Sequence, residues 1–568
     1  MLKHNFLPNK TLILCLMLAV LCAAHVGAPC EFMQGVEAQV LIAQEQTPSA
    51  PRASPSPIAT PSALPAKTAA TTRTLGDLQT RITNVLSKPE LAQSLVGIKV
   101  ASLDTGRVLF EENAFKLVRP ASNMKLYTVA TALDRLSPNF RYVTSVFAPA
   151  KPDAGGVVRG DLTVYGRGDP SFAARFNNGD YFKAIDELAA RIVAAGVKRV
   201  DGDLVGDESY FTGPPYGSGW GWEDLTWYYG AEVSALTIND NALDLFVKPG
   251  IEPGSKALIT TGPPDPLLTI INQVVTGAKG SRRDLTIYRD LGKDTLTISG
   301  NIAIDDRGYT GGVAVSRPAL LFVYLLRTSL AQKGVTITGR SRVVGTEYQT
   351  LLTPGTVLLS SSNAGASASQ TGSRIELASL QSLPLNIIAA QTLKPSQNLY
   401  TELILRTLGK AVPPAADPIT SPRTSEDAGL NVVKTFLREA GLVPEALSLT
   451  DGSGLSRNDM VTADATVQLL TFMSKHRYAD VFRAALPIAG VDGTLRNRMR
   501  GTPAENNLRA KTGSLSSAAS LSGYVTSAVG ENLVFSIIVN NYPDDLEPRT
   551  ACIDPIAVLL ASFAARSQ

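Results

Sequence analysis

Three short motifs, in one order along the chain, contain the residue types of a serine nucleophile that a lysine activates. They are Ser122-Asn123-Met124-Lys125, Ser396-Gln397-Asn398 and Lys511-Thr512-Gly513. A serine hydroxyl becomes a good nucleophile only when a neighbouring base takes its proton, and a lysine amine can do so when its pKa is lowered. Each motif alone could arise by chance, but together they predict acyl transfer to Ser122 with Lys125 as the general base.

The few histidines and cysteines argue against other kinds of catalytic site. His4 and His25 lie in a segment that we expect to be removed, and His476 ends a predicted amphipathic helix, where we expect a solvated side chain. A Ser-His-Asp triad is therefore not predicted. Outside the N-terminal apolar run, Cys30 and Cys552 could form a disulfide or be unrelated thiols. With one imidazole they cannot form a structural zinc site, and we predict no metal or cofactor.

Ser122 and Lys125 fall at the start of a predicted helix. Pro120 suits its first turn, and apolar residues recur at helical spacing, namely Met124, Leu126, Val129, Ala130 and Leu133. A separation of three residues places Ser122 and Lys125 on one face. The partially positive helix N-terminus disfavours an ammonium on Lys125. A fall of its pKa from about 10.4 to roughly 7.5 costs on the order of 4 kcal/mol and requires burial and a second cation, for which Lys511 is the candidate. An ordinary core helix with a surface lysine is the alternative.

The second motif lies in a loop that Pro395 opens, just before a predicted helix with one apolar face. Leu399, Leu403, Ile404 and Leu408 make up that face. We expect Ser396 to relay a proton toward the leaving group and the Asn398 amide to hold a peptide group of the substrate. A plain helix N-cap is the alternative, since Ser and Asn both cap well.

The third motif lies in a predicted strand, one of several antiparallel strands near the C-terminus. Lys511 and Thr512 offer a cation and a hydroxyl to a substrate carboxylate, and Gly513 allows the substrate backbone to approach closely. The N–H of Ser514, together with that of Ser122, could form an oxyanion hole, in which each donor contributes roughly 3 to 4 kcal/mol. A strand with a lysine that extends to solvent is the alternative.

The N-terminal region has the composition of export and tether segments. An apolar run, residues 12–24, follows Lys3 and Lys10 and is shorter than the roughly 20 residues of a membrane-spanning helix, so residues 1–28 are predicted to be a signal peptide. Whether it is cleaved or retained as an anchor stays open. Residues 29–74, rich in Pro, Ala, Ser and Thr, are predicted to be a disordered linker. We therefore expect an exported protein of the periplasm or cell-wall space.

The near balance of 53 basic and 50 acidic residues gives no reason to expect binding to nucleic acid or an anionic membrane.

Longer stretches of the chain resemble a known family. The three motifs are typical of penicillin-binding proteins and β-lactamases. Stretches such as YGAEVSALTINDNALDLFV, DGSGLSRNDMVT and LPIAGVDGTLRNRM further resemble the D-alanyl-D-alanine carboxypeptidase/endopeptidase family of class C penicillin-binding proteins, the penicillin-binding protein 4 type of serine peptidase family S13. The resemblance extends from about residue 75 to the C-terminus. One departure is Gln397, where the family usually has Asp.

The resemblance implies an α+β fold of the penicillin-binding protein/β-lactamase type, in which helices flank an antiparallel sheet. The first two motifs are much farther apart than in a β-lactamase, which fits the large insertion known in this family. We expect residues 75–145 and 378–568 to form the two parts of the catalytic domain. Residues 146–377 would form β-rich inserted domains, with two expected.

The resemblance also implies a penicillin-sensitive serine-type D-Ala-D-Ala carboxypeptidase, with or without DD-endopeptidase activity. Ser122 would attack the penultimate D-Ala carbonyl of a peptidoglycan stem peptide, and β-lactams would be covalent inhibitors. Arg457 is a candidate for contacting the substrate side chain, with a loop-shaping role of its surroundings as the alternative. The integrin-like tripeptide within residues 166–171 is interpreted as a turn without function.

Two other classes of protein stay open. A β-lactamase would share the acylation site but hydrolyse the drug quickly. Class A β-lactamases usually use a Glu-x-x-x-Asn stretch between the second and third motifs, and none occurs there. A non-catalytic wall sensor would have lost the nucleophile, the lysine or the third motif first, and all three are present.

Overall fold

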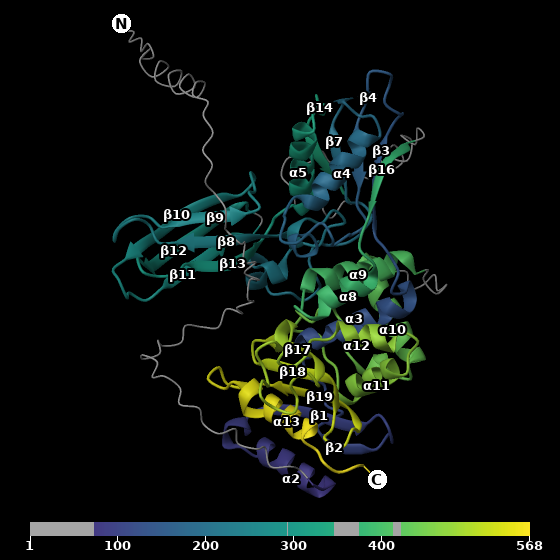
Figure 1. Cartoon of the computed structure of the whole chain (residues 1–568), viewed down its shortest axis with the longest axis vertical. Helices are drawn as coiled ribbons and strands as arrows, with labels where there is room; N and C mark the ends of the chain where they lie inside the picture. Colours follow the sequence, from purple (N-terminus) through teal and green to yellow (C-terminus); the bar gives the residue numbers. More distant parts are fainter. Residues whose placement is uncertain (1–72, 292, 346–373, 413–421, 568) are drawn as a thin grey trace, which may run out of the picture. The chain divides into compact units, whose positions relative to one another are not determined.

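The computed structural model describes residues 73–291, 293–345, 374–412 and 422–567. The predicted signal peptide, all but the last two residues of the predicted linker, and Cys30 lie outside these ranges. Figure 1 shows the helices and strands. The helices are α2 (Leu75–Leu86), α3 (Met124–Leu136), α4 (Lys183–Ala194), α5 (Pro318–Gln332), α8 (Leu385–Leu393), α9 (Asn398–Ala411), α10 (Ser425–Glu439), α11 (Ala463–Ser474), α12 (Ala479–Ala485) and α13 (Asp554–Ala561).

A five-stranded antiparallel sheet joins the two ends of the described chain. Its order is β17-β18-β19-β1-β2. The strands are β1 (Leu95–Ser102), β2 (Val108–Glu112), β17 (Arg509–Leu515), β18 (Ala518–Thr526) and β19 (Asn532–Asn540). The antiparallel pairing predicted for the C-terminal strands is confirmed. Because β1 pairs with β19 directly, the first and third motifs belong to one structural unit.

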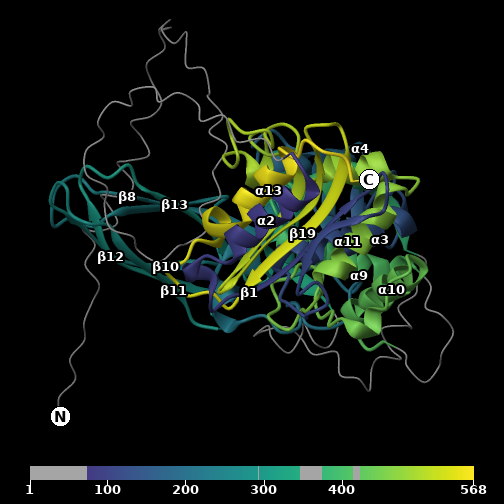
Figure 2. The ribbon, with the colours of Figure 1, turned by 90° about the horizontal axis from the view of Figure 1, so that it is seen from below.

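Helices cover both faces of this sheet, as Figure 2 shows. Side chains along β19 alternate between the two faces of the sheet. Phe535 and Ile537 belong to the core that α2 and α13 cover. Val534 and Ile538 belong to the core on the other face, which includes α3, α8, α9, α10 and α11. A strand buried on both sides needs apolar residues at successive positions. This requirement explains the continuous apolar run of β19.

The segment between α3 and α8 folds around a separate core. One sheet has the order β15-β7-β5-β3-β16 and a smaller one β14-β6-β4, with α4 and α5 packed nearby, while β13-β8-β9 and β10-β12-β11 form two further sheets. The strands are β3 (Val143–Ala148), β4 (Val157–Arg159), β5 (Leu162–Tyr165), β6 (Arg199–Asp201), β7 (Leu204–Asp207), β8 (Ala242–Lys248), β9 (Leu258–Gly262), β10 (Thr269–Gly277), β11 (Asp284–Arg289), β12 (Thr295–Ala303), β13 (Tyr309–Ala314), β14 (Thr336–Ile337), β15 (Ser341–Val344) and β16 (Ile375–Gln381).

The predicted limits of the insertion, residues 146 and 377, fall inside β3 and β16. These two strands pair with each other, so a boundary through both would divide one ladder. We propose instead that the inserted segment spans residues 143–381. Its division into two domains stays a prediction.

The architecture is α+β, as predicted, with helices on both faces of an antiparallel sheet and with further sheets formed by the segment between β2 and β17. Within the described ranges, no helix combines the length and the hydropathy needed to cross a bilayer.

Candidate active site

Ser122 lies in a short 3-10 turn, η2 (Ala121–Asn123), that leads directly into α3, and Lys125 is the second residue of that helix. Two serines of β18 anchor the turn. Asn123 Nδ2 donates to Ser522 Oγ of β18 at 2.7 Å, and Ser520 Oγ donates to the Pro120 carbonyl at 2.7 Å. Ala121, just before the serine, has a φ of 47°, a left-handed conformation that costs a residue with a Cβ about 1 to 2 kcal/mol. The fold therefore holds the serine in a fixed and strained turn.

Lys125 is completely buried, and three oxygen atoms surround its amine. Nζ lies 2.9 Å from Ser122 Oγ, 2.6 Å from Asn398 Oδ1 and 2.8 Å from the Ser453 carbonyl oxygen. Of these three, an amide oxygen and a carbonyl oxygen can only accept, whereas a hydroxyl can also donate. A neutral amine that donates to Asn398 and Ser453 therefore directs its lone pair at the Ser122 hydroxyl.

The orientation of the Asn398 amide is fixed from the opposite side. Its Nδ2 donates to the Tyr229 carbonyl at 2.8 Å, so Oδ1 must face Lys125. The neighbouring Gln397 serves as the N-cap of α9, because its Oε1 accepts from the Leu399 N–H at 3.0 Å. The interpretation of Ser396 and Asn398 as plain caps is therefore wrong. A side chain with a carboxamide or carboxylate suits this capping position, which explains why Gln can stand where the family usually has Asp.

The second and third motifs meet through Lys511, which is also completely buried. Its Nζ donates to Ser396 Oγ at 2.8 Å and to the Thr512 carbonyl at 2.9 Å. Ser396, just before α9, and Asn398, its first residue, thus contact one lysine each. The Thr512 hydroxyl lies 2.7 Å from that of Thr494, a residue that the sequence did not single out.

Gly513 is required by the packing of the protein itself. A Cβ at this position would lie 2.2 Å from Ser520 Oγ and 2.6 Å from the Pro120 carbonyl oxygen. The absence of a side chain thus lets β17 lie directly against the turn that carries Ser122. Ser514, the next residue of this edge strand, is exposed.

Arg457 pairs with acidic residues of the inserted segment. Its Nη1 lies 2.8 Å from Asp224 Oδ2, and its Nη2 lies 3.5 Å from Glu223 Oε1. These two ion pairs give the guanidinium charge its partners in the absence of a substrate. A role of Arg457 in substrate binding stays a prediction.

His476 corrects one expectation from the sequence. Its side chain is only 8% exposed and Nε2 lies 3.0 Å from Asp134 Oδ1, near the far end of α3 from Ser122. The predicted solvated position is wrong, because the residue packs against α3 just after α11 ends. The histidine does not contact the serine, in agreement with a site without a triad. Cys552 is a buried free thiol, and its suggested partner Cys30 lies outside the described residues.

The sequence missed the backbone groups of this site. The carbonyls of Ser453 and Tyr229 carry no side-chain signature, and nothing in the local sequence indicates that they contact Lys125 and Asn398. The stretch DGSGLSR gave the only hint for Ser453, since a loop rich in glycine exposes its backbone.

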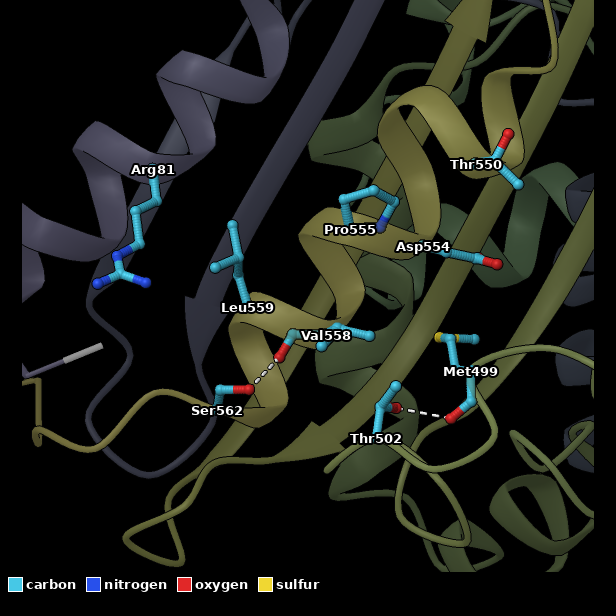
Figure 3. A pocket seen from close by; sticks show the side chains of 9 residues that line it. All are labelled: Arg81, Met499, Thr502, Thr550, Asp554, Pro555, Val558, Leu559 and Ser562. Atoms are coloured by element: carbon cyan, nitrogen blue, oxygen red, sulfur yellow. Dashed lines mark hydrogen bonds between the residues drawn. The ribbon is translucent and has the colours of Figure 1, made fainter. Parts of the chain in front are cut away.

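The described residues also include a surface cavity away from the predicted site residues. Among the described residues, no three His, Cys, Asp or Glu side chains are grouped so as to hold a metal ion. A surface cavity of about 390 Å³, drawn in Figure 3, carries none of the predicted site residues. Its hydroxyl groups bond within their own segments, for example Thr502 to the Met499 carbonyl and Ser562 to the Val558 carbonyl. It is lined by Arg81, Met499, Thr502, Thr550, Asp554, Pro555, Val558, Leu559 and Ser562.

Known proteins resemble this chain over most of its length. The sequence profile of the D-Ala-D-Ala carboxypeptidase 3 (S13) family matches residues 78–563. The D-alanyl-D-alanine carboxypeptidase of Actinomadura sp. (strain R39) is 34% identical over 513 residues, which cover 88% of each protein. The penicillin-sensitive carboxypeptidase A of Dictyostelium discoideum is 28% identical over 484 residues, 80% of this chain and 84% of that protein.

The fold is also similar to that of a solved structure. Penicillin binding protein 4 from Haemophilus influenzae superposes with a TM-score of 0.68 at 23% identity, over 85% of this chain and 97% of that one. That protein has also been solved in complex with a β-lactam. The predicted penicillin-binding protein-like fold and the resemblance to the S13 type are both confirmed.

Proposed function

Because the chain belongs to the D-Ala-D-Ala carboxypeptidase 3 (S13) family, we propose that its serine-type carboxypeptidase reaction takes place at Ser122 with Lys125 as the base. The observation that carries the proposal is the contact of 2.9 Å between Lys125 Nζ and Ser122 Oγ, with two pure acceptors on the other sides of the amine. Ser122 Oγ attacks the carbonyl carbon of the penultimate D-Ala, and its proton passes to the Lys125 lone pair.

The leaving group requires a proton as the C–N bond breaks. Ser396 and Lys511, joined by the hydrogen bond of 2.8 Å, are placed to deliver one to the departing D-Ala nitrogen. A water molecule then attacks the acyl-enzyme ester and gives one proton to the Ser396–Lys511 pair, which had lost one to D-Ala. As the ester bond breaks, Lys125 returns to Ser122 Oγ the proton that it took from it. The scheme balances, because one proton of the water replaces the proton delivered to the D-Ala nitrogen and the hydroxyl of the water completes the new carboxyl group.

The terminal carboxylate of the substrate would bind along β17. Lys511 and Thr512 provide the cation and the hydroxyl, and the N–H groups of Ser122 and Ser514 would donate to the developing oxyanion. Asn398 would hold a peptide group of the stem peptide while its Oδ1 stays on Lys125. Arg457 would contact the substrate side chain only if its ion pair with Asp224 opens.

β-Lactams are proposed as covalent inhibitors and peptidoglycan peptides as substrates. When Ser122 opens the β-lactam ring, the amine remains attached to the acyl group and cannot diffuse away, so hydrolysis is blocked. A relative carries the name penicillin-sensitive carboxypeptidase A, which supports this assignment. We further propose export to the periplasm or cell-wall space, on the basis of the apolar run at residues 12–24, which lies outside the described residues. Cleavage of cross-bridges, the endopeptidase reaction, is proposed for the same site.

Labelling with a fluorescent penicillin tests the assignment of nucleophile and base. Wild type is expected to form a long-lived adduct, Ser122→Ala none, and Lys125→Ala an adduct that forms at least 100-fold more slowly. An acylation rate of Lys125→Ala within a few-fold of wild type would show that another group is the base. Rapid release of the label would indicate a β-lactamase, and mass analysis of muropeptides from purified wall would separate carboxypeptidase from endopeptidase products.

A further inference from the structure

One buried carboxylate organises the loop that contacts Lys125. Asp451 is fully buried, and four donors point at its two oxygens. The Gly454 N–H donates to Oδ1 at 2.6 Å, whereas the Ser456 N–H at 2.8 Å, Trp220 Nε1 at 2.9 Å and Ser453 Oγ at 3.2 Å donate to Oδ2. A carboxyl group accepts at about four positions, so the four donors fill the acceptor positions of this side chain.

The loop that Asp451 holds, residues 451–456, packs against the start of α3. The Ser453 carbonyl accepts from Lys125 Nζ, and the Gly452 carbonyl accepts from Thr128 Oγ1 at 2.8 Å. Gly454 has a φ of 77°, and a Cβ there would lie 1.9 Å from the Ala121 carbonyl oxygen, next to the nucleophile. Any shift of this loop therefore moves a ligand of the Lys125 amine.

The other acids around Asp451 differ from it in their partners. Glu402 of α9 accepts from the Gly452 N–H at 3.1 Å, and Asp459 accepts from the Thr450 N–H at 2.6 Å, yet each has a second buried oxygen without a partner among the described residues. Burial, followed by the charge of Asp451, raises the pKa of Glu402 to about 8 and that of Asp459 well above its usual range. Arg406 and Glu426 are the remaining charged groups that act on Glu402. Of these three acids, only Asp451 has hydrogen-bond donors on both of its oxygens.

We propose that Asp451 is a positioning residue for acylation: it holds the Ser453 carbonyl against Lys125 Nζ and so directs the lone pair of the amine at Ser122. This inference rests on the proposed role of Lys125 as the base. One of the two carbonyl-type acceptors of the amine is Asn398 Oδ1, which the second motif supplies. The other is supplied by a loop whose shape depends on Asp451.

Pre-steady-state labelling with a fluorescent penicillin tests the inference. Asp451→Asn places an amide N–H among four donors, so the loop must shift, and a displacement of about 1 Å can cost 10²-fold in rate. We expect the first-order acylation constant at saturating penicillin to fall about 10- to 100-fold, while the apparent dissociation constant of the initial complex and the fraction of labelled molecules stay near wild type. A purely structural role would instead lower the labelled fraction and leave the acylation constant unchanged, which would overturn the proposal.

Asp459→Asn is the matched control, because an amide replaces a carboxyl group of the same size in the same cluster, and its oxygen still accepts from the backbone N–H groups of Thr450 and Asp451. Its acylation constant is expected to stay within about 2-fold of wild type; a fall as large as that of Asp451→Asn would assign the effect to the cluster in general and reject the special role of Asp451.

If Asp451→Asn does not fold, Trp220→Phe removes one donor to the carboxylate and should slow acylation several-fold; an unchanged rate would contradict the inference. Failure of wild type to form any adduct at Ser122 would reject the proposed function, whereas normal labelling of Asp451→Asn rejects only the positioning role.

Discussion

At the scale of single residues, burial disfavours the charged forms of side chains, and the surrounding partners offset this cost. Lys125 and Lys511 are both fully buried, and each contacts a serine hydroxyl and a carbonyl oxygen. Burial disfavours the ammonium of a lysine and the carboxylate of an acid alike. The same rule therefore governs the acids that surround the site.

Glu402 gives a prediction for the pH dependence of stability. Its pKa is raised to about 8, chiefly by burial and then by the charge of Asp451, whereas the unfolded chain ionises near the ordinary value of 4.5. Between these values the folded state binds more protons than the unfolded state, so the free energy of unfolding falls as pH rises, by up to about 1.4 kcal/mol per pH unit. Denaturant unfolding at several pH values should show a clearly flatter decline for Glu402→Gln.

Glu208→Gln serves as the comparison for this prediction. Burial raises the pKa of Glu208 to about 7, so its contribution has the same sign but ends about one pH unit lower. Between pH 7 and 8, therefore, Glu402→Gln should change the slope more than Glu208→Gln. An identical slope for Glu402→Gln and wild type over this interval would show that Glu402 is ionised in the folded protein.

At the scale of elements, the site depends on how closely β17 lies against the turn before α3. Gly513 faces Ser520 and Pro120, and Ser520 itself donates to the Pro120 carbonyl. The sequence predicted that this glycine makes room for the substrate backbone. The structure adds a reason internal to the protein, since a side chain at this position would push the strand away from Ser122.

Gly513→Ala should accordingly lower both stability and activity. The new methyl group overpacks a rigid contact, and we expect the free energy of unfolding to fall by about 1 to 3 kcal/mol and acylation by penicillin to slow at least 10-fold. Gly76→Ala in α2 is the control, because a Cβ there meets nothing within 4 Å, and Ala favours a helix over Gly. Its stability should be unchanged or slightly higher. Equal thermal unfolding and equal labelling rates for Gly513→Ala and wild type would refute this account.

At the scale of the whole molecule, the inserted segment takes part in the site. The Tyr229 carbonyl orients Asn398, Trp220 donates to Asp451, and Asp224 pairs with Arg457. All three residues lie within 220–229, a short stretch of 3-10 turns, η4 (Trp222–Thr226) and η5 (Tyr228–Gly230). The insertion therefore supports the groups that contact Lys125.

A double-mutant cycle on Arg457 and Asp224 measures this support. Asp224 is 7% exposed, so Arg457→Ala leaves a buried carboxylate without its main partner and should cost more stability, about 3 kcal/mol or more, than Asp224→Asn. We expect a coupling energy of about 1 to 3 kcal/mol in denaturant unfolding. If Arg457 instead binds the substrate side chain, Arg457→Ala will mainly raise KM for stem peptides and the cycle will show no coupling.

The sequence alone determined which residues can do the chemistry and which local elements carry them. Residue types and periodicity are local signals. They sufficed to predict the three motifs, the helix after Ser122, the helix after Asn398 and the C-terminal strands. It also excluded a triad through the scarcity of histidine, although the burial of His476 against Asp134 was not foreseen.

Only the tertiary structure decided how these residues are oriented. Several contacts of the site join groups that no local sequence pattern relates. They are those of the Ser453 and Tyr229 carbonyls, the four donors to Asp451, the cap formed by Gln397 and the pairing of Arg457 with Asp224. Backbone carbonyls are present at every residue, so their identity as ligands depends on where the chain passes. The proposed direction of the Lys125 lone pair depends on such groups, which come together only when distant segments have folded.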